Sequence, residues 1–317
     1  MTSTTLERGA RARDRRRRSG REAWEEPPTP VGQAGKAVTL TFVLAVVIVP
    51  LYTVVLTSLS PQSSINIAGG LVLVPRGLTF AAYERIFDNQ LVTHSLWVST
   101  WITAVGTVLS MGVTILCSYG LSQTRSFGHR TVLMLLVITM FFSGGLIPSF
   151  LVVSALGGYN EYWSLILPSA VSVFNILVMR GFFANTAQEL MDAARVDGAG
   201  HWRILWSVVL PTSRPVIVVI SLFYAVGYWN TFFNALLYLP DNAKWPLQMV
   251  IYTYTYQGNA MPGSGTTTTG QYYGHQEIAP LAIQMAVVTL TLLPIVVAYP
   301  FVQRHFSKGM LMGAIKG

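Results

Sequence analysis

Six long apolar stretches run along the chain, and shorter segments rich in charged and polar residues separate them. An α-helix rises about 1.5 Å per residue, so about 20 apolar residues cross the roughly 30 Å hydrocarbon layer of a bilayer. All six stretches reach that length. The pattern therefore predicts an all-α, six-span polytopic membrane protein. The predicted spans are residues 37–60, 95–121, 131–154, 162–183, 214–239 and 279–303.

The segments outside these spans define the predicted organisation. Residues 1–36 are rich in Arg and lack apolar periodicity, as expected of a water-exposed tail. A twin-arginine export signal is the other interpretation, but the apolar stretch that follows is long enough to span and lacks a small-residue cleavage pattern. Residues 61–94 form a long loop that is predicted to be extracytoplasmic, in which residues 83–87 predict a short surface helix. Residues 95–303 hold the other five spans, and residues 304–317 form a second tail.

The distribution of Lys and Arg predicts the orientation of the chain. Eighteen of the 21 fall in the two tails, in the segment after the second span and in the stretch from Arg180 to Arg214 around the fourth connection, and only Arg76, Arg85 and Lys244 fall elsewhere. Because Lys and Arg accumulate in cytoplasmic loops, both termini and residues 185–211 are predicted to be cytoplasmic. The same distribution argues against a nucleic-acid groove, which needs basic residues along one folded face.

Composition and the absence of chemical motifs narrow the function. With 52% hydrophobic and 11% charged residues, the sequence is not that of a soluble domain. No Asp, Glu, Lys or Arg lies in the middle of a predicted span, which argues against an ion-coupled carrier. The single Gly-Lys pair, Gly35-Lys36, lacks the first glycine and the hydroxyl residue of a phosphate-binding loop. The chain is therefore predicted to be no enzyme and to hold no metal or cofactor.

The most informative polar segment is residues 185–211, between the fourth and fifth predicted spans. Leu190, Ala193 and Ala194 recur at helical spacing, so a short amphipathic helix is expected there. Gly198 can take the left-handed conformation that ends a helix. A second helical pattern follows the glycine. Two short helices on either side of a glycine break form a shape suited to docking.

This segment resembles the cytoplasmic signature loop of ABC importer permeases, commonly written E-A-A-x-x-D-G-A, eight residues, I-x-L-P. Asp192 stands in place of Glu and Val208 in place of Ile, and a proline expected near Ala187 is absent. The other motif positions match. The docking residues that the resemblance implies are Glu189, Asp192, Ala193, Ala194, Asp197, Gly198, Ala199, Leu210 and Pro211, with Asp192 suited to pair with a cation on the ATPase.

Three further stretches, residues 141–183, 224–250 and 299–317, are similar to the carbohydrate-uptake class of these permeases, of the maltose-permease type, and to its complex-oligosaccharide subgroup. The resemblance implies the transmembrane fold of a type I ABC importer in the bacterial plasma membrane. It also implies a sister permease in a heterodimer, two ABC ATPase subunits that use ATP, and an extracytoplasmic sugar-binding protein. Residues 309–317 are expected to reach the ATPase interface.

Uncharged polar and aromatic residues in the spans are candidates for a substrate pathway. Asn230 and Asn234 are four positions apart, which predicts one helical face in the fifth span. Amides can bond sugar hydroxyls, and aromatic rings can stack on sugar faces. Packing between helices explains the same residues, and the resemblance favours the pathway. The candidates are Asn175, Tyr224, Trp229, Asn230 and Asn234.

Two other functions remain open. An importer of amino acids or peptides shares the docking loop and would differ only in cargo. A secondary carrier would need no ATPase, and transport driven by an ion gradient without ATP would distinguish it. The sequence alone favours an ATP-driven carbohydrate importer.

Overall fold

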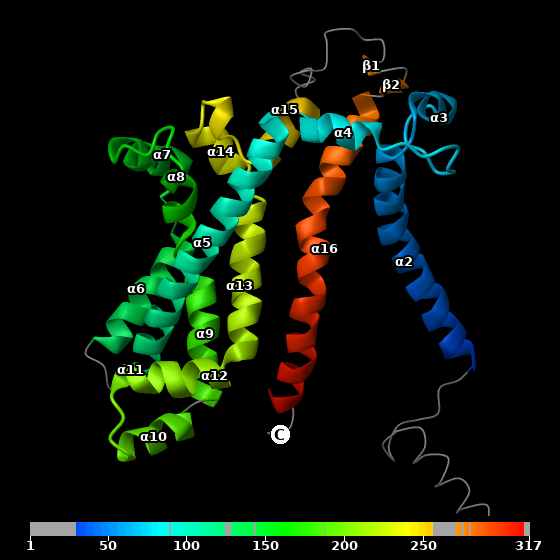
Figure 1. Cartoon of the computed structure of the whole chain (residues 1–317). Coiled ribbons are helices and arrows are strands. Elements are labelled where there is room, and N and C mark those ends of the chain that lie inside the picture. The colour runs from blue at the N-terminus through cyan, green and yellow to red at the C-terminus, as the bar shows by residue number, and fades with distance from the viewer. Residues whose placement is uncertain are drawn as a thin grey trace, which may run out of the picture. The chain divides into compact units, whose positions relative to one another are not determined.

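The computed structural model describes residues 30–88, 90–123, 128–142, 144–186, 188–255, 271–273, 276–278 and 280–313, which are almost entirely helical (Figure 1). The chain forms two compact units, residues 1–52 and 53–317. Most of the predicted tail 1–36 and the last residues of the tail 309–317 lie outside the described residues.

The first long helix, α2, runs from Pro30 to Ser58 and therefore begins before the predicted span 37–60. Large apolar side chains are exposed along its part in the first unit, for example Val38 and Phe42. A helix whose apolar side chains face outward is typical of a membrane environment. The residues of its last turns, such as Leu56 and Thr57, are buried in the second unit.

The second unit contains the other helices and a two-stranded antiparallel hairpin of β1 (Gln271–Tyr273) and β2 (Gln276–Ile278). The short helix predicted at residues 83–87 is confirmed, because α4 spans Ala81–Asp88. The bounds are α3 (Gln62–Ala68), α4 (Ala81–Asp88), α5 (Gln90–Ser122), α6 (His129–Phe141), α7 (Leu146–Ala155), α8 (Trp163–Ile166), η1 (Leu167–Ser169), α9 (Val173–Thr186), α10 (Gln188–Val196), α11 (His201–Ile204), η2 (Leu205–Val209), α12 (Leu210–Thr212), α13 (Arg214–Trp229), α14 (Phe233–Tyr238), η3 (Asn242–Lys244), α15 (Leu247–Thr255) and α16 (Pro280–Gly313).

Three helices in the described residues are long and apolar enough to cross a membrane unaided: α2, α5 and the Pro280–Pro300 part of α16. Three bent helix pairs also qualify if each is taken as one span. The all-helical, multi-span prediction is therefore confirmed. Pro294 and Pro300 lie inside α16 without ending it.

The third and fourth predicted spans are broken, as their Gly and Pro residues suggest. In the third, α6 and α7 meet at 114° across Gly145, which has a φ of 84°. In the fourth, the α8–η1 piece and α9 meet at 50°, close to Pro168. Backbone breaks of this kind are tolerated at membrane depth where protein or a cavity surrounds them.

The fifth predicted span, 214–239, does not form one continuous helix. It consists of two helices with a break between them. α13 ends at Trp229, and α14 begins at Phe233. Asn230 carries the bridge-region angles φ −89° and ψ 14° at the end of α13. The prediction that Asn230 and Asn234 share one continuous helical face is therefore wrong, because the helix ends between them.

Helices α5 and α13 pack closely through small and hydroxyl residues. A Cβ on Gly106 would come within 2.8 Å of the Tyr228 ring, so only glycine allows this approach. The Tyr228 hydroxyl lies 2.8 Å from Ser110 Oγ, and the Tyr224 hydroxyl lies 2.7 Å from Thr114 Oγ1. Small residues that admit close approach, combined with hydrogen bonds across helices, are the usual means of helix association in membranes.

Candidate functional site

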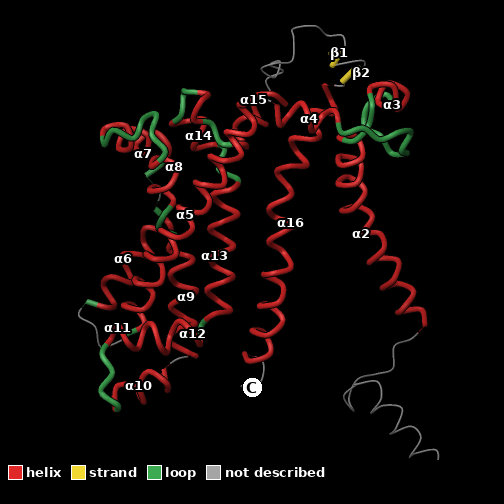
Figure 2. Tube along the Cα trace, viewed as in Figure 1, coloured by secondary structure: helices red, strands yellow, loops and turns green. Residues whose placement is uncertain are grey.

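The break at Gly198 has the geometry of a helix-terminating motif. Ala199 N donates to Ala194 O over 2.9 Å, and Gly198 N donates to Arg195 O over 3.0 Å. These are the two bonds of a Schellman motif, with Gly198 in the left-handed position at a φ of 76°. The structure thus contains the predicted helix, glycine break and second helix (Figure 2, where the loop between α10 and α11 is green).

The second helical piece lies across the axis of the span that follows it. It comprises α11, the π-helical turn η2 and α12, and it meets α13 at 84°. Ile204, Leu205 and Val209 are buried and hold this piece against the rest of the unit. π-helical turns often occur at functional sites. Leu210 packs partly against the same core, whereas Pro211 is exposed at the start of α12.

The outer surface of the segment combines exposed charged and apolar residues. Asp192, Ala193, Asp197 and Gly198 are exposed, and Ala194 and Ala199 are half-buried. Val196 is 88% exposed, and Trp202 and Trp206 are 66% and 67% exposed. Exposed apolar side chains on a polar segment indicate a surface for another molecule. Glu189 lies in α10, but its side chain falls outside the described part of the structure.

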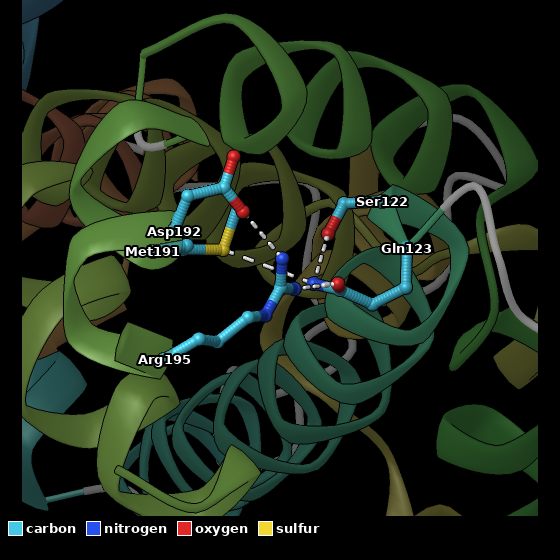
Figure 3. Close-up of polar contacts among 5 residues, drawn as sticks. All are labelled: Ser122, Gln123, Met191, Asp192 and Arg195. Carbon is cyan, nitrogen blue, oxygen red and sulfur yellow. Dashed lines mark hydrogen bonds and ion pairs between the residues drawn. The ribbon is translucent and has the colours of Figure 1, made fainter. Parts of the chain in front are cut away.

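The surroundings of Asp192 differ from the expectation of a carboxylate held ready for a partner. Arg195 Nη1 donates to Asp192 Oδ1 over 2.6 Å within α10. The other guanidinium nitrogen, Nη2, donates to Gln123 Oε1 just beyond the end of α5 (Figure 3). Asp192 is therefore already paired inside the chain, although its side chain is 57% exposed.

Neither Arg195 nor Gln123 was among the predicted site residues. Gln123 is 72 residues from Arg195 in the sequence, so no local pattern could join them. The presence of a charged residue on a predicted docking helix was the only available signal. A second contact nearby joins Tyr119 Oη, as donor, to His201 O over 3.1 Å. The end of α5 thus contacts the segment on both sides of the Gly198 break.

A cavity of about 390 Å³ lies where α13 ends and α14 begins, against η1 and α9. Its described lining consists of amide, hydroxyl, aromatic and glycine residues, and no lining residue carries a formal charge at neutral pH. The lining residues are Ser169, Ser172, Asn175, Phe223, Tyr224, Gly227, Tyr228, Asn230, Thr231, Phe232, Phe233 and Asn234.

Four of the five predicted pathway residues line this cavity: Asn175, Tyr224, Asn230 and Asn234. Both asparagines therefore line one cavity, although the break at the end of α13 brings them together and not a shared helical face. Trp229 lies elsewhere. It is buried, and its Nε1 donates to Thr291 O of α16 over 3.0 Å.

The amides of the cavity retain hydrogen-bonding capacity. Asn230 Nδ2 donates to Val226 O over 2.9 Å, while its Oδ1 lies 3.4 Å from Gln248 Nε2. Asn234 makes a longer contact of 3.5 Å with Ser169 Oγ. Both side chains are at least partly exposed. By contrast, the Tyr224 and Tyr228 hydroxyls bond α5, so part of the polar stripe also serves packing, as the alternative interpretation holds.

Comparison with known proteins identifies the family to which this chain belongs. Residues 127–312, which include the 185–211 segment and the cavity, match the family model "binding-protein-dependent transport system inner membrane component". The chain belongs to this family. Members are multi-pass transport permeases of the inner membrane and not enzymes, and they work in systems that include a binding protein and ATPase subunits.

Two curated relatives of this permease come from Bacillus subtilis. The polygalacturonan/rhamnogalacturonan transport system permease protein YtcP is 41% identical over 252 residues, covering 78% of this chain and 85% of YtcP. Protein LplC is 38% identical over 273 residues, covering 86% and 90%. A solved bacterial ABC transporter that imports the acidic polysaccharide alginate contains a chain with a TM-score of 0.81 and 26% identity, covering 90% of this permease and all of that chain.

Proposed function

We propose that this permease forms one half of the membrane pathway of an ATP-driven importer of carbohydrate, and that its cargo is an oligosaccharide. The observation that carries the proposal is the uncharged cavity. Its amides and hydroxyls can exchange hydrogen bonds with sugar hydroxyls, and Phe223, Phe232 and Phe233 supply apolar rings for sugar faces. YtcP and the alginate importer both transport saccharides, which supports a saccharide as cargo.

The proposed assembly has a sister permease as heterodimer partner, two ATPase subunits and an extracytoplasmic sugar-binding protein. The 185–211 segment is the docking element for one ATPase subunit, and its exposed Val196 and Trp202 support a protein contact there. The Lys and Arg distribution supports a cytoplasmic position for this segment and for both termini. ATP is used by the partner subunits.

The part of the cargo that contacts this cavity is proposed to be uncharged. YtcP and the alginate importer handle polymers described as polygalacturonan and an acidic polysaccharide. A buried carboxylate needs a cation or several donors in compensation. The described lining of this cavity offers amide and hydroxyl donors but no Lys or Arg. Neutral sugar units therefore fit this half of the pathway better than uronate units.

The energy source separates the proposal from a secondary carrier. We expect the complete complex, in proteoliposomes with its binding protein, to accumulate labelled oligosaccharide only when ATP reaches the ATPase side. A proton or sodium gradient without ATP should produce no accumulation, because the described span interiors lack coupling carboxylates. Accumulation driven by an ion gradient alone would contradict the proposal. Uptake of peptides or amino acids by the same complex would favour the non-sugar alternative.

A second prediction concerns the two asparagines that line the cavity. Replacing both Asn230 and Asn234 with alanine should lower oligosaccharide uptake by roughly thirtyfold, because two hydrogen bonds of about 1 kcal/mol each are lost. Asn66→Ala, at an exposed position of α3, is the matched control and should leave uptake unchanged. Copurification of the partner subunits checks assembly. Normal uptake by the assembled double variant would show that these amides only pack.

A further inference from the structure

The contact between Arg195 and Gln123 lies between the docking segment and the end of α5, a 33-residue helix of the membrane core. Arg195 belongs to α10, and Gln123 follows directly after the end of α5 (Figure 3). One guanidinium nitrogen donates to Gln123, and the other donates to Asp192 over 2.6 Å. The ion pair thus fixes the direction of the guanidinium, and the second bond reaches the core.

Further contacts hold the same end of α5 against the segment. Gln123 Nε2 lies 3.7 Å from the sulfur of Met191, which is fully buried in α10. The Tyr119 hydroxyl donates to His201 O across the Gly198 break. α10 is therefore joined to the end of α5 by the Arg195 bond and the weaker Met191 contact, both to Gln123, and α11 is joined to it through Tyr119.

Helix α5 also connects the docking segment to the cavity. α5 is a continuous helix of 33 residues, and Thr114 and Ser110 on it bond Tyr224 and Tyr228. Both tyrosines line the cavity, and Tyr228 also donates to Ile166 O over 3.0 Å, which ties α5 and α13 to α8. Rigid helices joined by hydrogen bonds are the kind of physical connection that can couple distant sites.

From these contacts we propose that Arg195 and Gln123 are positioning residues that transmit the movement of the docking helix to α5, and through α5 to the cavity. Asp192 orients Arg195 through the ion pair within α10. The proposal rests on the 185–211 segment being the docking element. Arg195 is 35% exposed, so water screens part of its interaction.

The test uses Gln123, because it lies outside the docking segment and its replacement leaves the segment's own residues unchanged. In the purified complete complex, Gln123→Leu should lower the amount of sugar imported per ATP hydrolysed by about tenfold, as expected for loss of a hydrogen bond to a charged group. Gln123→Glu keeps an acceptor for Arg195 and should retain the ratio. Arg130→Leu, an exposed cytoplasm-proximal arginine on α6, is the charge control and should also retain it.

A double-mutant cycle separates the tether from other roles of Arg195. Arg195→Leu should lower the ratio as Gln123→Leu does, and the double variant should be no worse than either single variant. The exchange of the two residues, Arg195→Gln with Gln123→Arg, should recover part of the ratio. A normal ratio in Gln123→Leu with a low ratio in Arg195→Leu would overturn the tether and leave the docking proposal standing. If Gly198→Val and Asp192→Lys both import normally, the docking proposal itself fails.

Discussion

Replacing Gly198 with valine is expected to lower ATP-driven uptake by tenfold or more while the complex still inserts and assembles. At a φ of 76° a β-branched side chain meets its own backbone, and a residue forced into this conformation costs about 1–2 kcal/mol. The chain can relieve that strain only by unwinding the end of α10. The two helices of the docking segment would then lose their fixed relation.

Gly198→Asn is the matched variant that isolates the backbone effect. Beyond the neighbouring residues, no heavy atom lies within 4 Å of a Cβ built on Gly198, so the strain of a substitution there comes from the local backbone. Asparagine tolerates the left-handed conformation and should retain most uptake. ATP hydrolysis with and without liganded binding protein, together with uptake, provides the measurement. Loss of uptake in both variants would point to bulk against the partner surface, and normal uptake in Gly198→Val would show that this geometry is not needed.

Local patterns in the sequence were sufficient to predict the helices and the docking segment. Helical spacing of apolar residues, a glycine where a helix must end and a proline near a bend are all short-range signals. They correctly placed α4 and the left-handed Gly198. One short-range feature was available and missed, which is the buried small-residue stripe of α5 from Gly106 through Ser110, Thr114 and Ser118 at intervals of four.

The features that were mispredicted depend on tertiary structure. Asn230 and Asn234 have the spacing of one helical face, but α13 ends between them, and the Asn230 side chain bonds the helix end at Val226 O. Trp229 has polar and aromatic sequence neighbours, as a pathway residue would. Its indole nevertheless bonds Thr291 of α16, 62 positions away. The Arg195–Gln123 contact spans a comparable distance along the chain. Such pairs become visible only when the helices are packed.

The second large expected effect concerns the side of the membrane on which the docking segment lies. A cysteine introduced at Gly200 should be shielded from a membrane-impermeant thiol reagent in intact spheroplasts. Gly200 is exposed and adopts extended angles of φ −70° and ψ 161°, so a cysteine is tolerated there. The background is Cys117→Ala, because the native cysteine is exposed on α5. Ala243→Cys in η3, on the predicted outer side, is the positive control.

This labelling is the most direct measurement of the central claim, because a docking segment for a cytoplasmic ATPase must face the cytoplasm. If the segment faces the cytoplasm, the Ala243 cysteine reacts in intact spheroplasts and the Gly200 cysteine reacts only after the membrane is permeabilised. Reaction of the Gly200 cysteine in intact spheroplasts, at a rate like that of the Ala243 cysteine, would contradict both the orientation and the docking role.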